Sequence, residues 1–135
     1  MDKIDFKKRL ADYRAKEHLF DLITIPKRQY LMVDGHGDPN TSKEFKDAIT
    51  ALYPVAYKLK FASKTEVGKD YVVMPLEGLW TADDMSSFTT ARDKSKWDFT
   101  LMIMQPDWIT QDMFEVALQK IFNLLYPEIF PVWKV

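Results

Sequence analysis

Apolar side chains recur at helical spacing in three parts of the chain, residues 4–20, 41–62 and 106–125. In the first part they are separated by many charged side chains, which predicts a weakly amphipathic helix. The second part carries a longer apolar stripe, and the third follows Thr110, a residue type that often caps the start of a helix. The pattern therefore predicts three helices.

The start of the second predicted helix also carries a local signal. Thr41 is followed three residues later by Glu44, the spacing of a capping box in which each side chain bonds a free backbone N–H of the first turn. We therefore expect Thr41 to be the N-cap of the helix.

Three further segments, residues 27–34, 69–80 and 97–105, favour strands. The last of them is apolar on both faces, which is typical of a central strand that is covered on each side. These segments predict an α+β fold, in which a three-stranded antiparallel sheet carries the 41–62 helix on one face. The tail, residues 126–135, contains two prolines and is expected to be extended.

Composition narrows the class of protein. A chain of 135 residues is about one domain, and 19 basic against 20 acidic side chains leave no global attraction for nucleic acid or an anionic membrane. The chain has no cysteine, and its first twenty residues are charged without an apolar run. We therefore expect a cytoplasmic protein that binds neither nucleic acid directly nor a membrane.

One acidic residue lies within an otherwise apolar stretch, DYVVMPLEGLW. Glu77 stands between Leu76 and Gly78, with Trp80 three residues later. An ionised carboxylate on an apolar face is costly unless something pairs with it. Glu77 is therefore either an exposed residue at the end of a strand or part of a binding site, where its charge would meet a cationic ligand and aromatic rings would stack on it.

Three motifs occur in a fixed order along the chain. They are YLMVDGHGDPN at residues 30–40, MPLEGLW at residues 74–80 and WDFTLMIMQPDWIT from Trp97. Together they resemble the bacterial GyrI-like small-molecule-binding proteins over about residues 5–122. That family is similar to the effector-binding domains of multidrug-responsive regulators, which place two strand-helix-strand-strand modules around a pocket for bulky aromatic or cationic molecules.

The resemblance implies a set of ligand-binding residues and a domain organisation. The ligand-binding candidates are Tyr71, Glu77, Trp80, Trp97, Met102 and Met104. Residues 1–135 are expected to form a single GyrI-like domain that lacks most of the family's second module, which in the relatives supplies a pocket tyrosine and a carboxylate. A homodimer that places two copies where the family has two modules is therefore expected.

Three classes of function remain open. The first is a pocket for a hydrophobic, aromatic or cationic small molecule, with a role in xenobiotic or toxin protection. The second is hydrolysis of cyclopropane-bearing genotoxic natural products, as some members of the family perform, with Glu77 as the candidate catalytic residue. The third is a protein-interaction module such as a gyrase modulator. We expect no cofactor and no metal, since His36 between Asp34 and Asp38 is more typical of turn chemistry than of a metal site.

Overall fold

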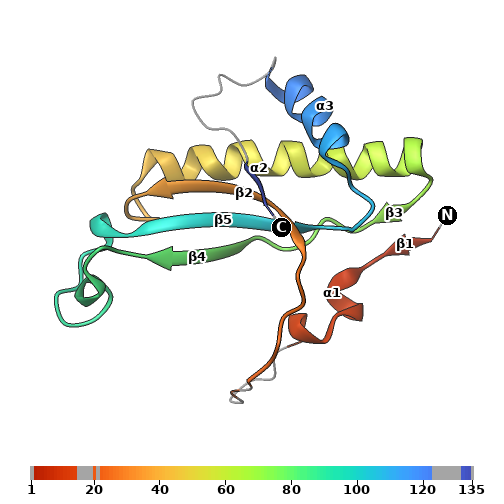
Figure 1. Cartoon of the computed structure of the whole chain (residues 1–135). Helices are drawn as coiled ribbons and strands as arrows, with labels where there is room; N and C mark the ends of the chain where they lie inside the picture. The colour runs from red at the N-terminus through yellow and green to blue at the C-terminus, as the bar shows by residue number, and fades with distance from the viewer. Residues whose placement is uncertain (1, 15–19, 21, 123–131, 135) are drawn as a thin grey trace.

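The computed structural model of the chain describes residues 2–14, 20, 22–122 and 132–134 (Figure 1). Its main sheet has the strand order β4-β5-β2-β6 and is antiparallel throughout. These strands are β2 (Gln29–His36), β4 (Glu77–Thr81), β5 (Asp98–Gln105) and β6 (Val132–Lys134). Helix α2 (Lys43–Ala62) lies along one face of this sheet, and α3 (Gln111–Phe122) packs against α2. The α+β class and the packed helix are confirmed.

Strand β5 is central, as its two apolar faces predict. It pairs with β4 on one side and with β2 on the other, and Leu101, Met102, Ile103 and Met104 are all buried. The core lies between the sheet and α2, where Leu31, Val33 and Ile103 meet Leu52, Val55 and Leu59 of the helix. The apolar stripe of the helix therefore forms the core that its period predicts.

Two helix starts can be compared with the predictions. Ser42 caps α2, since its hydroxyl accepts a hydrogen bond from the Phe45 N–H at 3.4 Å, so the prediction of Thr41 is wrong by one residue. Glu44 accepts instead from the backbone N–H of His36 at 2.8 Å, and this contact ties the helix start to the end of β2. Thr110 caps α3 as predicted, accepting from the Met113 N–H at 3.2 Å.

The prediction of one strand over residues 69–80 is wrong. The structure has a short β3 (Asp70–Tyr71), then irregular backbone, and then β4 from Glu77. Pro75 lies in the interruption, and a proline has no N–H to donate to a sheet. The break allows β3 to join a second, two-stranded sheet while β4 joins the main one.

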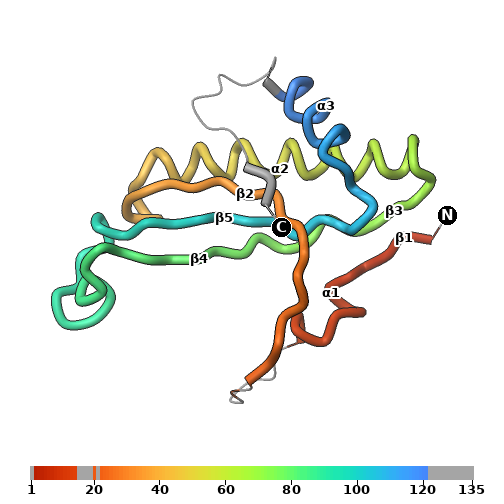
Figure 2. Tube along the Cα trace, in the orientation of Figure 1, coloured from red at the N-terminus to blue at the C-terminus, as the bar shows by residue number. Residues whose placement is uncertain are grey.

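The predicted helix over residues 4–20 is also wrong where the structure describes it. Residues 2–14 form β1 (Lys3–Ile4), a single turn α1 (Phe6–Arg9) and a 3₁₀ turn η1 (Ala11–Tyr13). Strand β1 pairs in parallel with β3, and this pairing competes with a helical start. Residues 15–19 lie outside the described part. The N-terminal segment, residues 2–14, lies on the side of the sheet opposite α2 (Figure 2).

The remaining predictions concern the ends of the chain. Within the tail, Val132–Lys134 form β6 against β2, whereas residues 126–131 and 135 lie outside the described part. The predicted third helix is observed as α3 up to Phe122, and residues 123–125 are not described.

A buried ion pair joins the end of α2 to β3. Lys60 Nζ lies 2.8 Å from Asp70 Oδ1, and the two side chains are only 10% and 5% exposed. The hydrogen bond from Lys60 holds the pKa of the Asp70 carboxyl below its usual value, so Asp70 is ionised at neutral pH. Both charges are compensated, which burial requires. The pair therefore fixes where the chain turns back from α2 toward the N-terminal segment.

Gly35 lies against the Phe99 ring across the β2–β5 pair. A Cβ at Gly35 would lie 2.2 Å from Cζ of the Phe99 ring, which is itself 2% exposed and packed against Phe45 and Trp80. Only glycine leaves room for the ring at this position.

We therefore predict that Gly35→Ala destabilises the chain by about 1–3 kcal/mol, the usual cost of overpacking a core. Combining it with Phe99→Leu should recover part of that loss, because the second substitution removes the ring atoms that clash. Urea denaturation of both single variants and the double variant measures these changes in the free energy of unfolding. If Gly35→Ala costs the same in the wild-type chain and in the Phe99→Leu variant, the Phe99 ring is not what excludes a side chain at position 35.

Candidate functional site

The register of the main sheet decides which predicted site residues share a face. Side chains alternate along a strand, and residues directly opposite each other in an antiparallel pair lie on the same side. Glu77 is opposite Met102, which is in turn opposite Met32, so these three form one row. Tyr30 and Met104 form the next row on that face. Trp80, opposite Phe99, belongs to the other face, which carries α2.

The face of the sheet opposite α2 meets the N-terminal segment, and this contact forms the candidate site. The Tyr13 hydroxyl donates a hydrogen bond to Glu77 Oε2 at 2.5 Å, although the two residues are 64 positions apart in sequence. Tyr13 is placed there by the turn η1 and by β1, which is anchored on β3. Both side chains are half-buried. Glu77 thus has a neutral hydrogen-bond donor as its partner.

An arginine beside this pair is already neutralised. Arg28 forms a two-pronged ion pair with Asp12, with N–O distances of 2.5 and 2.8 Å, and the two side chains are 11% and 15% exposed. The guanidinium also lies 5.8 Å from the centre of the Tyr13 ring. Within the described part of the chain, no basic side chain lies at ion-pair distance from Glu77. The cluster of Asp12, Arg28 and Glu77 therefore has a net charge of about −1.

The pKa values of the neighbouring groups follow from this arrangement. Burial, followed by the hydrogen bond to Glu77, raises the pKa of Tyr13 well above its ordinary value. Burial and the Glu77 charge also raise the pKa of Tyr30. The hydrogen bond from Arg28 lowers the pKa of Asp12. Both phenols therefore stay neutral at physiological pH, and the negative charge of the site resides on carboxylates.

A small pocket adjoins this cluster on the same side of the sheet. Its volume is about 130 Å³, and Arg28 forms part of both the pocket and the Tyr13–Glu77 surroundings. Met104, one of the predicted ligand-binding residues, lines it together with Phe6, Leu10 and Trp108. Sulfur and aromatic side chains of this kind suit flat apolar ligands.

The other predicted site residues lie elsewhere. Trp80 and Trp97 contact each other, with ring centroids 5.8 Å apart, and Trp80 also stacks on Phe45 of α2. Tyr71 is 1% exposed and packs against Trp108. The structure thus brings Glu77 and Met102 together, with Met104 nearby, but separates them from Trp80 and Trp97.

Sequence reasoning missed three residues of the site: Asp12, Tyr13 and Arg28. Tyr13 fits the apolar stripe of the predicted first helix. Asp12 and Arg28 are charged, but the sequence gives no sign that they pair with each other. The Asp12–Arg28 pair spans 16 positions and the Tyr13–Glu77 pair spans 64, so neither has a local spacing signal. Only the fold brings them together.

His36, whose acidic neighbours in sequence could suggest a metal site, pairs with a single carboxylate. His36 Nδ1 lies 2.6 Å from Asp98 Oδ1 across the β2–β5 pair, and that hydrogen bond raises the pKa of His36. Among the described residues, no group of three or more His, Cys, Asp or Glu side chains is placed to hold a metal ion.

None of the helices in the described part is long and apolar enough to cross a membrane.

Comparison with known proteins identifies relatives of the chain. The chain matches three solved structures from Listeria innocua. One is of an uncharacterized conserved protein (32% identity, TM-score 0.78), and two are of proteins described as hydrolases (32% and 31% identity, TM-scores 0.77 and 0.75). Each match covers 98% of this chain and 66–67% of the relative. No protein-family model and no curated protein matches the chain.

The fold and the site define an α+β protein with a carboxylate on the sheet face opposite its long helix. At this identity and coverage, the chain belongs to the family of the Listeria innocua proteins. It spans about two thirds of their length.

The Tyr13–Glu77 contact can be tested by a double-mutant cycle. We predict that Tyr13→Phe and Glu77→Gln are coupled by about 1 kcal/mol or more in the free energy of unfolding, because a hydrogen bond to a charged acceptor is stronger than a neutral one. Urea denaturation of wild type, both single variants and the double variant measures the coupling. A cycle between Glu77→Gln and Tyr57→Phe, an exposed tyrosine on α2, is the control and should show none. Additive losses for Tyr13 and Glu77 would argue against the contact.

Proposed function

We propose that the chain binds a small hydrophobic cation on the sheet face that carries Glu77, as a small-molecule-binding protein of the GyrI-like type. One observation carries this proposal: Glu77 is half-buried, accepts a hydrogen bond only from the neutral Tyr13 phenol in the described part, and has no basic partner there. A partly desolvated carboxylate without a countercharge gains more from a cationic ligand than one in bulk water does.

The surroundings of Glu77 favour a flat, apolar ligand body. Met32 and Met102 share its row on the sheet, and the rings of Tyr13 and Tyr30 border it. Methionine adapts to irregular shapes, and tyrosine faces attract cations. The Asp12–Arg28 pair supports the same interpretation, since a neutralised arginine does not repel a cationic ligand as a free one would.

We predict that Glu77→Gln weakens a planar aromatic cation about tenfold or more, a loss of about 1.4 kcal/mol, and hardly changes binding of a neutral ring of the same shape. The substitution keeps the size and one acceptor oxygen of the side chain but removes the charge. Titration calorimetry with both ligands measures the two dissociation constants. Glu115→Gln, an exposed acid on α3, is the matched control and should change neither. Equal losses for both ligands would mean that Glu77 shapes the strand end without meeting the ligand.

Hydrolysis is a second candidate, because two solved relatives are described as hydrolases. In this case Glu77 orients a water molecule and takes up its proton, and the rings around it exclude bulk solvent. The neutral Tyr13 phenol, whose pKa is raised, is a donor that keeps its proton throughout the physiological range. A cyclopropane-bearing alkylating agent is the substrate class that the GyrI-like resemblance suggests.

Ring opening of such a compound, followed by chromatography, separates the two candidates. If the chain is a hydrolase, Glu77→Gln should slow ring opening about 10²–10⁴-fold, the usual contribution of a positioned acid or base, while binding of the neutral compound is retained. If the wild-type chain binds the compound without opening it above the buffer rate, the hydrolase candidate is wrong and the binding function remains. A Glu77→Gln variant as fast as wild type would exclude this residue from catalysis.

A further inference from the structure

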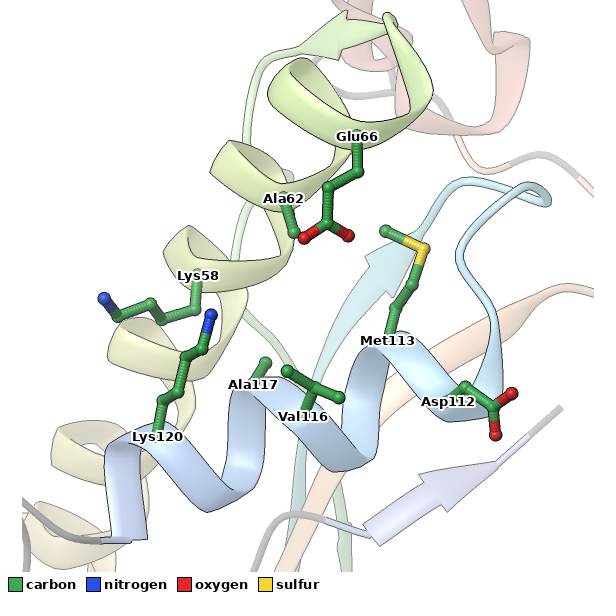
Figure 3. Close-up of a pocket in the computed structure, with 8 residues that line it drawn as sticks. All are labelled: Lys58, Ala62, Glu66, Asp112, Met113, Val116, Ala117 and Lys120. Atoms are coloured by element: carbon green, nitrogen blue, oxygen red, sulfur yellow. The ribbon is translucent and has the colours of Figure 1, made fainter.

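A second open groove lies on the opposite side of the molecule from Glu77. It runs between α2 with its π-helical extension η2 (Ser63–Val67) on one side and α3 on the other, and its volume is about 210 Å³ (Figure 3). Its apolar lining comes from Ala62, Met113, Val116 and Ala117. Val116 is 51% exposed although it belongs to this lining, so the groove presents apolar surface to water.

The charges around the groove are separated along it. Lys58 of α2 and Lys120 of α3 line one end, whereas Glu66 faces Met113 at the other end (Figure 3). Asp112 also lines the groove, and its carboxylate points away from Met113. Within the described part of the chain, neither lysine has a carboxylate at ion-pair distance. The Lys120 ammonium ends beside the Lys58 side chain, whereas the Lys58 ammonium points outward from the groove (Figure 3). Both positive charges therefore belong to the same end of the groove, where they attract an anion.

We propose that this groove binds a small organic anion with a short apolar chain, its carboxylate between Lys58 and Lys120 and its chain along Val116 and Ala117 toward Met113. Charge complementarity fixes the orientation, because the opposite arrangement would place the carboxylate beside Glu66. Helix α2 lies between the groove and the sheet, so this site is independent of the cation site proposed at Glu77.

The volume of the groove limits the size of the ligand. Pockets for drug-sized molecules span about 300–1,000 Å³. The present groove holds about seven water-sized groups, since each water occupies about 30 Å³ of liquid. A chain of about five carbons that ends in a carboxylate at the Lys58–Lys120 end of the groove is of the right size, and hexanoate is therefore the probe.

Titration of the ¹⁵N-labelled chain with hexanoate, followed by amide chemical shifts, tests the proposal. We expect saturable shifts confined to residues 58–66 and 112–120. Hexylammonium and hexanol, which have the same number of carbons without the negative charge, should bind at least about threefold more weakly. Absence of saturable shifts in this region, or equal binding of hexylammonium, would overturn the proposal.

Substitutions test the two lysines and the apolar lining separately. Lys58→Gln and Lys120→Gln should each weaken hexanoate about threefold, and about tenfold together, as expected for partly exposed ion pairs that act additively. Val116→Asp should abolish binding by placing a negative charge on the apolar lining. Lys46→Gln, an exposed lysine of α2 outside the groove, is the control and should leave binding unchanged. All four positions are exposed, and the amide spectrum reports whether each variant is folded. Undiminished hexanoate binding by the double lysine variant would also overturn the proposal.

Discussion

The antiparallel pairing of β2 with β5 determines both the core and the candidate site. It joins eight residues of each strand, from Gln29 opposite Gln105 to His36 opposite Asp98. Because side chains alternate, this one register assigns every residue of both strands either to the α2 face or to the face opposite α2. A slip by one residue would place Ile103 on the Glu77 face and Met102 in the core. The contact of Gly35 with the Phe99 ring helps to exclude such a slip.

The candidate site depends on that register and on the break at Pro75. If residues 69–80 formed one continuous strand, β3 could not leave the main sheet and pair with β1. The pairing of β1 with β3 brings the N-terminal segment across the sheet, where Tyr13 reaches Glu77 and Asp12 reaches Arg28. The buried Lys60–Asp70 pair stabilises the same junction from the helix side. Site and fold are therefore held by the same few contacts.

Much of this architecture could be predicted from the sequence, because its signals are local. The apolar period of residues 41–62 gives α2, the two apolar faces of residues 97–105 give a central strand, and Thr110 caps α3. Within residues 2–14 the predicted long helix is reduced to the single turn α1, because the pairing of β1 with β3 outweighs a weak helical pattern. The break in residues 69–80 has a visible signal in Pro75, whose missing N–H outweighs the apolar run around it.

The site could be predicted only in part, because side chains alternate between the two faces of a strand. Three of the predicted site residues, Glu77, Met102 and Met104, lie on the same face of the sheet. Trp80 is three positions from Glu77 and therefore lies on the other face of the strand. Tyr13 and Arg28 could not be assigned from the sequence, because their partners are distant and each side chain has an ordinary role in an amphipathic segment. Composition also gives no hint that Asp12 neutralises Arg28.

A planar aromatic cation bound on the face of the sheet that carries Glu77 must lie against Met32 and Met102, which share the row of Glu77. Intermolecular nuclear Overhauser effects between the bound cation and the methionine methyl groups report this contact. We expect contacts from the ligand to the methyl groups of Met32 and Met102 and to the Tyr13 ring. Contacts instead to the rings of Trp80 and Phe45, on the face that packs against α2, would refute the proposed site.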